Sequence, residues 1–137
     1  MNILKILIIE DTVERINILK QLYRKHAWIN VNTAERANKL VTHYKFDLIS
    51  LDFDLAGQQT GDVVAKHITN GINKKTKVVV HSMNPTGRNK IKELIPHAII
   101  FPISAMTKTN ELFKSLREEL NTNGINFDWS GFHNKFG

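Results

Sequence analysis

Carboxylates cluster at two points of this sequence, each directly after a short apolar run. Glu10 and Asp11 follow the run at residues 3–9, and Asp52 follows the run at residues 46–51. Acidic side chains that lie close together raise one another's pKa unless a cation neutralises them. Carboxylate oxygens suit a hard divalent ion, most simply magnesium. If the two runs are neighbouring parallel strands, we expect these three residues to hold Mg²⁺ or Mn²⁺.

A third group of polar side chains follows the β-branched run at residues 77–80. His81, Ser82, Asn84 and Arg88 bring hydrogen-bond donors and a cation to one strand end and the start of the next helix. This is the chemistry that a phosphate group needs. Ser82 and Asn84 have an alternative role as helix caps, and His81 is either a structural residue or an acid or base.

Strand-like and helical segments must position these groups, and they alternate along the chain. The strand-like segments are 3–9, 27–32, 47–52, 77–81 and 97–101, and the helical patterns that follow them are 13–23, 34–44, 62–69, 85–94 and 112–120. Five βα units at this spacing predict right-handed crossovers and a parallel sheet. We therefore expect an α/β fold: a doubly wound, five-stranded parallel sheet of flavodoxin-like order 2-1-3-4-5, with helices on both faces. Its switch point lies between strands one and three, where the carboxylates are.

Local signals predict several helix ends. Asp11 and Glu14 have the spacing of a capping box for the first helix, and Thr33 is a suitable cap for the second. Gly71 predicts the end of the third helix. Asn84, which precedes a proline, predicts the start of the fourth.

Length and composition indicate one domain. The chain has 137 residues, of which 42% are hydrophobic and 23% charged, as in ordinary globular domains. We expect the domain to cover residues 1–120 and an aromatic tail to cover residues 121–137, joined by a hinge at 121–124. The tail either packs on a groove of the domain or acts as a partner-binding segment or lid.

The formal charge of +6 would attract an anionic partner. The basic residues are spread along the chain without interleaved aromatics, so we expect no nucleic acid partner. No apolar run approaches the roughly 20 residues of a membrane span. The start lacks an export signal and the chain has no cysteine, which favours a cytoplasmic protein with no membrane partner.

Residues 3–120 resemble the receiver domain of bacterial response regulators. Glu10-Asp11 looks like that family's acidic pair, Asp52 like its phospho-acceptor and Ser82 like its strand-four Ser/Thr. The resemblance implies a metal site made by the acidic pair, Asp52 and a backbone carbonyl two residues beyond it.

In this sequence that carbonyl belongs to Asp54. The family also has a lysine before a proline at the end of strand five, and here Phe101 precedes the proline. Phenylalanine cannot make the lysine's charge-assisted contact with the acceptor or its phosphoryl group. The resemblance therefore implies an atypical receiver that keeps the metal site and lacks the usual strand-five cation.

A narrower resemblance involves residues 51–55, Thr60-Gly61 and residues 81–88. Together these segments look like an atypical receiver branch that processes cyclic phosphates. Phe53 departs from that branch, which often has histidine at this position.

Two functions follow, and the sequence leaves open whether the chain is an enzyme. The first is a signalling domain in which Asp52 accepts a phosphoryl group from a phosphodonor, or stays unmodified, and the domain docks a partner protein. The second is a metal-dependent phosphoesterase acting on a cyclic nucleotide or other cyclic phosphate, in which Asp52 attacks or activates water. Ser82 and Asn84 would then hold phosphoryl oxygens. Arg88 would supply charge, and His81 would protonate the leaving oxygen.

Overall fold

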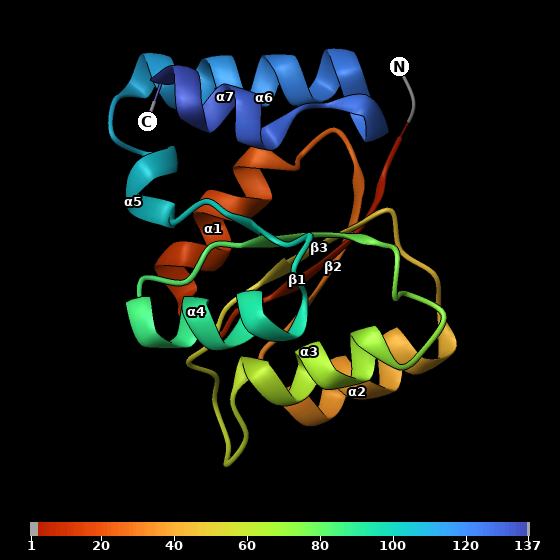
Figure 1. The fold of residues 1–137 in the computed structure, drawn as a ribbon. Helices are drawn as coiled ribbons and strands as arrows, with labels where there is room; N and C mark the ends of the chain where they lie inside the picture. The colour runs from red at the N-terminus through yellow and green to blue at the C-terminus, as the bar shows by residue number, and fades with distance from the viewer. Residues whose placement is uncertain (1–2, 137) are drawn as a thin grey trace.

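A five-stranded sheet with helices on both faces makes up residues 3–136, the part of the chain that the computed structural model describes (Figure 1). The elements are β1 (Lys5–Ile9), α1 (Val13–Leu22), β2 (Ala27–Val31), α2 (Ala34–His43), β3 (Leu48–Leu51), α3 (Gly61–Thr69), β4 (Lys77–Val80), α4 (Pro85–Leu94), β5 (Ile99–Ile100), α5 (Ile103–Met106), α6 (Asn110–Asn123), the 3₁₀-helix η1 (Gly124–Asn126) and α7 (Trp129–Phe136). All strand pairs are parallel and their order is β2-β1-β3-β4-β5. The predicted fold class is confirmed.

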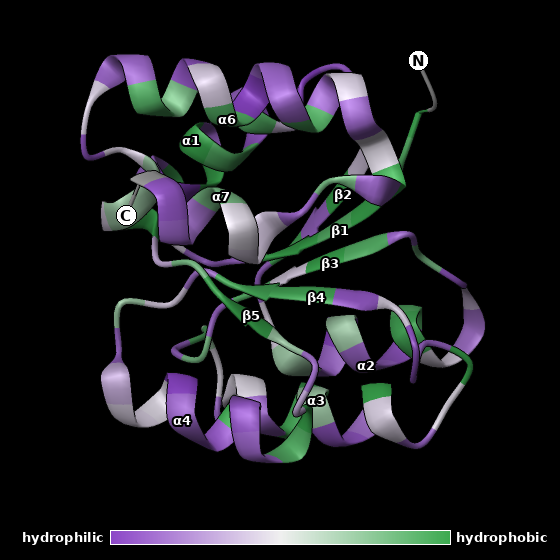
Figure 2. Cartoon of the chain, turned by 45° about the horizontal axis from the view of Figure 1, so that its top comes forward, coloured by the Kyte–Doolittle hydropathy of each residue, from purple (hydrophilic) through white to green (hydrophobic). Residues whose placement is uncertain are grey.

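Successive side chains of β1 enter two different hydrophobic cores. Ile6 and Ile8 are buried in the core shared with α1, α6 and α7, whereas Leu7 and Ile9 are buried in the core shared with α2, α3 and α4. Strand side chains point alternately to the two faces, and helices cover both faces here. The central strands are therefore apolar almost throughout, as their green colour in Figure 2 shows. Polar side chains become frequent only where these strands end.

Two of the predicted helix caps are confirmed. The Oγ1 atom of Thr33 accepts a hydrogen bond from the backbone N–H of Arg36. The Oδ1 atom of Asn84 accepts one from the N–H of Gly87, so α4 begins as predicted.

The capping box predicted for α1 is wrong, and so is the C-cap residue predicted for α3. The N-cap of α1 is Thr12, whose side chain makes no capping bond. The carboxylate that accepts from the backbone before this helix belongs to Glu10, which takes the N–H groups of Asp11 and Thr12. Helix α3 ends at Thr69, the last residue of the predicted helix 62–69, and its C-cap is Asn70 and not Gly71.

The C-terminal segment packs on the rest of the domain. Helix α6 continues through residue 120 to Asn123, so the hinge predicted at 121–124 is wrong; the chain turns at Gly124, which has a φ of 55°. Phe127, Trp129 and Phe132 are buried in the core on the α1 side. Packing on the domain was one of the two alternatives for the tail. Met1, Asn2, Gly137 and the side chain of Phe136 lie outside the described residues.

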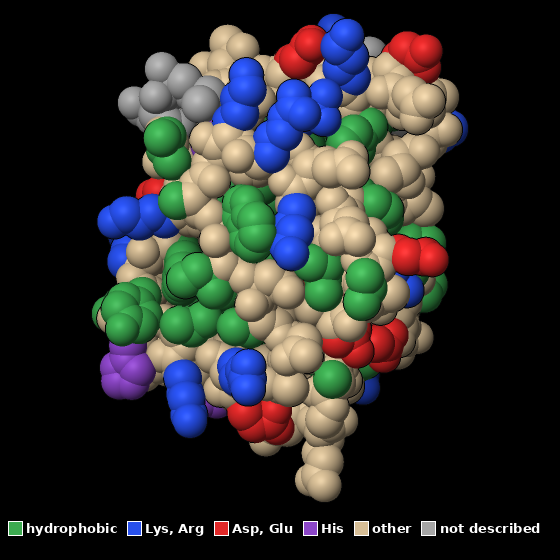
Figure 3. Space-filling model, turned by 180° about the vertical axis from the view of Figure 1, so that it is seen from behind, with side chains coloured by type: hydrophobic (Ala, Val, Ile, Leu, Met, Phe, Trp, Pro, Cys, Tyr) green, Lys and Arg blue, Asp and Glu red, His purple; other side chains and the backbone are tan. Residues whose placement is uncertain are grey.

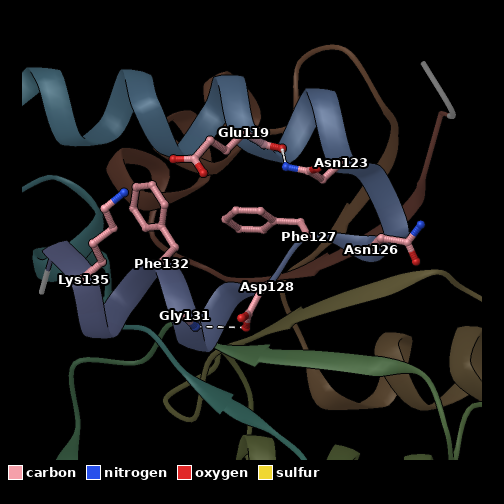
Figure 4. Close-up of a pocket in the computed structure, with 8 residues that line it drawn as sticks. All are labelled: Glu119, Asn123, Asn126, Phe127, Asp128, Gly131, Phe132 and Lys135. Carbon is pink, nitrogen blue, oxygen red and sulfur yellow. Dashed lines mark hydrogen bonds between the residues drawn. The ribbon is translucent and has the colours of Figure 1, made fainter.

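A polar anchor and a small pocket accompany this packing. The Nζ atom of Lys77, at the start of β4, donates to the carbonyls of Ile125 and Phe127 at 3.0 Å each. A pocket of about 280 Å³ lies between α6 and α7, with Phe127 and Phe132 between the two helices in Figure 4. The rings of Phe127 and Phe132 therefore form part of the lining of this pocket.

Along residues 3–136, none of the helices combines the length and the apolar character that crossing a bilayer requires.

Candidate metal and phosphate site

Three polar residues follow the ends of three neighbouring strands in one row. The strands β1, β3 and β4 end level with one another, on the paired residues Ile9, Leu51 and Val80. The backbone pairing extends one residue further, because Asp52 N donates to the carbonyl of β1's last residue at 3.0 Å and His81 N donates to that of β3 at 3.1 Å. Glu10, Asp52 and His81 therefore lie side by side. By strand alternation they face the α1 side of the sheet.

Glu10 is fully buried and uses both carboxylate oxygens. Its Oε2 atom accepts the N–H groups of Asp11 and Thr12 at 2.9 Å each, and its Oε1 atom accepts from His81 Nε2 at 2.9 Å. Burial raises the pKa of Glu10, but the hydrogen bond and charge of His81, with help from the backbone donor, lower the pKa to about 2 overall. Glu10 is therefore a carboxylate at neutral pH.

Asp52 is also fully buried, and its carboxylate has fewer donors. Its Oδ1 atom accepts from Phe53 N at 2.8 Å, and its Oδ2 atom lies 3.4 Å from Nη1 of Arg15. Burial and the negative charge of Glu10 raise the pKa of Asp52 to about 6, against the opposing effects of His81 and Ser82. Two adjacent buried carboxylates of this kind are under-neutralised, which is the condition that favours binding of a cation.

His81 is held on both sides of its ring. Its Nδ1 atom lies 2.9 Å from Ser50 Oγ, whose oxygen in turn accepts from the hydroxyl of Tyr23 at 3.3 Å. Burial raises the pKa of Tyr23, so the phenol keeps its proton. Tyr23, Ser50, His81 and Glu10 thus form a buried hydrogen-bonded chain. These hydrogen bonds hold the imidazole of His81 in place. His81 is the residue predicted to act as the acid for a leaving group.

Glu10, Asp52 and His81 fit a divalent ion. Each can offer one ligand atom, and these three atoms lie within 4.8 Å of one another. From the sequence, His81 was predicted to take part in acid and phosphate chemistry and not in metal binding. The signal for a role of His81 in metal binding was its position directly after a strand, which is also the position of Asp52.

Two of the predicted metal ligands lie at the edge of this group. Asp11 is half-buried and is not among the three, and burial and the charge of Glu10 raise its pKa. The side chain of Asp54 is exposed and accepts from Asn84 Nδ2 at 3.2 Å. Their part in metal binding stays a prediction.

The three predicted phosphate-binding residues all hold the loop between β4 and α4. Ser82 Oγ accepts from Asn84 N at 3.1 Å, and Arg88 Nη1 donates to the carbonyl of Ser82 at 3.2 Å. Asn84 caps α4. These contacts match the capping role that the sequence left open, and the phosphate role stays a prediction.

Two glycines bring helices close to the segment that carries Asp52. A Cβ atom on Gly61 would lie 2.1 Å from the carbonyl oxygen of Asp52, and one on Gly87 would lie 2.2 Å from Cγ of Phe53. Phe53 is buried in the space that Gly87 leaves, which accounts for an aromatic residue at this position. Helices α3 and α4 are therefore packed closely against the segment of Asp52 and Phe53.

Arg15 is the residue of this site that sequence reasoning missed. Its Nη1 atom lies 3.4 Å from Asp52 Oδ2 and 3.9 Å from Glu10 Oε1, and its side chain is 33% exposed. A partial signal was present in the sequence, because Arg15 lies in the first turn of the helix that begins just after the acidic pair. Arg15 partly neutralises the two carboxylates.

Phe101 borders the same row on the β5 side. Its N–H donates to the carbonyl of Val80 at 2.9 Å, so it lies beside His81. Its ring is 1% exposed and contacts the rings of Trp129 and His133. The position where a cation was expected is therefore apolar and covered by α7.

A larger pocket, of about 550 Å³, lies at the opposite ends of the strands. It is lined by Lys5, Ile6, Ala27, Trp28, Ile29, Leu40, His43, Tyr44, Lys45 and Phe46. Figure 3 shows hydrophobic side chains with basic ones among them on this face. None of the predicted site residues lines it, so we assign the chemistry to the strand ends that carry the carboxylates.

Comparison with known proteins agrees with this geometry. The model of the family described as "Cyclic-phosphate processing Receiver domain" matches residues 5–97, which include all the residues discussed above from Glu10 to Arg88. No curated protein shows significant sequence similarity to the chain.

Three solved structures with the same fold are described as response regulators. The phosphorylated cyanobacterial phytochrome response regulator RcpA is 21% identical, with a TM-score of 0.69 over 88% of this chain and 93% of that one. The Mn²⁺-bound form of response regulator Rcp1 is 20% identical, with a TM-score of 0.68 over 86% and 92%. TrrA from Thermotoga maritima, in complex with Mg²⁺ and BeF, is 20% identical, with a TM-score of 0.62 over 82% and 97%. At these identities the likeness concerns the fold.

Proposed function

This chain belongs to the cyclic-phosphate processing receiver domains, and we propose that its Glu10, Asp52 and His81 hold Mg²⁺ or Mn²⁺ and that the site hydrolyses a cyclic phosphate. One observation carries the proposal: ligand atoms of these three residues lie within 4.8 Å of one another at the carboxyl edge of the sheet. Rcp1 and TrrA, which share the fold, are metal-bound proteins, which supports the choice of ion.

The residues suit hydrolysis of a phosphodiester ring. A bound divalent ion would neutralise charge on the phosphoryl oxygens. Asp52 accepts a proton from the attacking water as the new P–O bond forms and one ring P–O bond breaks. The departing alkoxide takes up a proton from a solvent water molecule, and Asp52 then releases its proton to solvent, so the product is a phosphate monoester. His81 is enclosed by Ser50 and Glu10, so in this proposal it is not the acid for the leaving group. As a metal ligand it would give up its hydrogen bond to Glu10 when the ion binds. The loop of Ser82, Asn84 and Arg88 faces the phosphoryl oxygens in this proposal.

A panel of cyclic mono- and dinucleotides, including nucleoside 2′,3′-cyclic phosphates, tests the activity. Each is incubated with the protein and Mg²⁺, and products are separated by chromatography. We expect a monoester product that disappears in Asp52→Asn and after chelation of the metal. Asp47→Asn is the matched control, because Asp47 lies at the far end of the same strand and accepts from Lys5 N. An inert wild-type protein that still binds Mg²⁺ would contradict the proposal.

The second candidate is phosphoryl signalling, and the position of Asp52 at the end of β3 in a receiver fold favours it. In this case Asp52 accepts a phosphoryl group from a phosphodonor, and the domain docks a partner protein. Incubation with acetyl phosphate and Mg²⁺, followed by intact-mass measurement, asks whether a phosphorylated species forms. A phosphorylated species that is absent from Asp52→Asn, with no turnover of cyclic phosphates, would favour this candidate over the first.

A further inference from the structure

Arg15 is a cation placed over the two carboxylates of the site. Only its Nη1 atom makes contacts, at 3.4 Å to Asp52 and 3.9 Å to Glu10, and both are longer than a well-formed charge-assisted hydrogen bond. A guanidinium has five N–H donors in a planar fork. The other donors of Arg15 make no hydrogen bond or ion pair with the residues that the structure describes. Most of the binding capacity of this side chain is therefore unused.

Other cations near the site are already engaged or absent. Arg88 donates to the carbonyl of Ser82, and the ammonium of Lys90 lies 5.8 Å from the centre of the Phe53 ring. On the β5 side, Phe101 is buried under α7 and carries no charge. Within residues 3–136, Arg15 is thus the cation in direct contact with Asp52.

The contacts of Arg15 involve the same oxygens that a metal ion would use. Glu10 Oε1 accepts from His81 and lies 3.9 Å from Arg15 Nη1, and Asp52 Oδ2 lies 3.4 Å from the same Arg15 atom. If a divalent ion bound these oxygens, its positive charge would repel the guanidinium of Arg15. Because the side chain of Arg15 is one-third exposed, it can turn toward solvent when a metal ion occupies the carboxylates of Glu10 and Asp52.

We propose that Arg15 neutralises Glu10 and Asp52 in the metal-free protein and, once a divalent ion has replaced it there, binds the phosphoryl group of the ligand. The inference rests on the metal site of the proposed function and assigns the anion-binding half of that site. A guanidinium suits this role because it pairs two N–H donors with two phosphoryl oxygens. The assigned ligand class is a phosphate ester or free phosphate.

The test compares Arg15→Gln with Arg24→Gln by calorimetry. Arg24 is exposed just beyond the C-terminal end of α1, so its replacement makes the same charge change away from the site. Mg²⁺ is titrated into each metal-free protein, and inorganic phosphate is then titrated into each Mg²⁺-saturated protein. In Arg15→Gln we expect Mg²⁺ to bind roughly threefold to tenfold more tightly, because a competing, partly exposed cation is gone. We expect phosphate to bind at least roughly tenfold more weakly, because a charge-assisted pair is lost.

Opposite changes in the two affinities are the signature of this role. Arg24→Gln should leave both affinities at the wild-type level, and Arg15→Lys should keep part of the phosphate affinity. A purely structural Arg15 would weaken both ligands together, and that result, or unchanged phosphate affinity, overturns the proposal. A wild-type protein that binds Mg²⁺ but no phosphate overturns it as well. Because the probe is inorganic phosphate, failure to hydrolyse cyclic phosphates would sink the proposed activity and leave this inference standing.

Discussion

The ring of Phe101 lies stacked on the imidazole of His133, with 4.5 Å between the ring centroids and 22° between the planes. Trp129 meets the same ring edge-on, at 6.0 Å. The end of β5, which borders the row of Glu10, Asp52 and His81, is therefore covered by α7. The C-terminal helix belongs to the hydrophobic core of this domain.

Replacing Phe101 by alanine should cost about 3–5 kcal/mol of unfolding free energy, because it removes a fully buried aromatic ring and leaves a cavity under α7. Urea unfolding followed by circular dichroism measures the loss. Phe113→Ala is the control, because Phe113 is only partly buried on α6 and should cost less. Equal losses for the two variants would mean that α7 does not pack on Phe101 in solution.

Asp52→Asn should stabilise the metal-free protein at pH 7.5, because it removes one of two adjacent buried charges. The pKa of Asp52 is raised to about 6 from 3.8, which corresponds to about 1–3 kcal/mol. For an acid with a raised pKa, the folded state binds more protons than the unfolded chain between the two values, so the penalty is complete above pH 6 and disappears below pH 4. Thermal unfolding at pH 7.5 and at pH 4 checks the sign. The variant should also lose the stabilisation that Mg²⁺ gives the wild type.

Gly87→Ala should destabilise the protein by about 1–3 kcal/mol, because the added methyl group would lie 2.2 Å from Cγ of Phe53. The overlap involves Cγ and Cβ of Phe53, which lie close to its backbone, so rotating the ring about the Cβ–Cγ bond cannot relieve it. A double-mutant cycle with Phe53→Ala isolates the effect. The cost of Gly87→Ala should fall in the Phe53→Ala background, and additive costs would show that the two residues do not touch.

His26 should make the fold sensitive to mild acid. Its Nδ1 atom accepts from Leu4 N and its Nε2 atom is paired with Asn121, each at 3.0 Å, and burial lowers the pKa of His26 below 6.5. Below pH 6.5 the unfolded chain therefore binds a proton more readily than the folded protein does. The free energy of unfolding consequently decreases as the pH is lowered.

The stability difference between wild type and His26→Gln should accordingly shrink from pH 7.5 to pH 5.5, because only the wild type has this histidine to protonate. Taking the difference cancels the titration of groups common to both proteins. A constant difference for His26→Gln over this range would contradict the assignment.

Much of the architecture could be predicted because its signals are local. Apolar runs and helical periodicity mark the elements, and parallel strands bring their carboxyl ends to one edge. The positions of Glu10, Asp52 and His81 after strand ends could therefore be predicted. The short helix α5 and the helix α7 were not predicted, because short or terminal helices depend on the surface they pack against more than on their own sequence.

Hydrophobic periodicity and chain connectivity allow few arrangements of the strands, so their order and the residues at their carboxyl ends follow from the sequence. Which of those residues meet depends on the folded structure. The hydrogen bond from His81 to Glu10 joins positions 71 residues apart, and the contact of Arg15 with Asp52 joins positions 37 apart. Such pairs depend on the register of the sheet and on where buried side chains find partners, and neither is encoded in the spacing of residues along the chain.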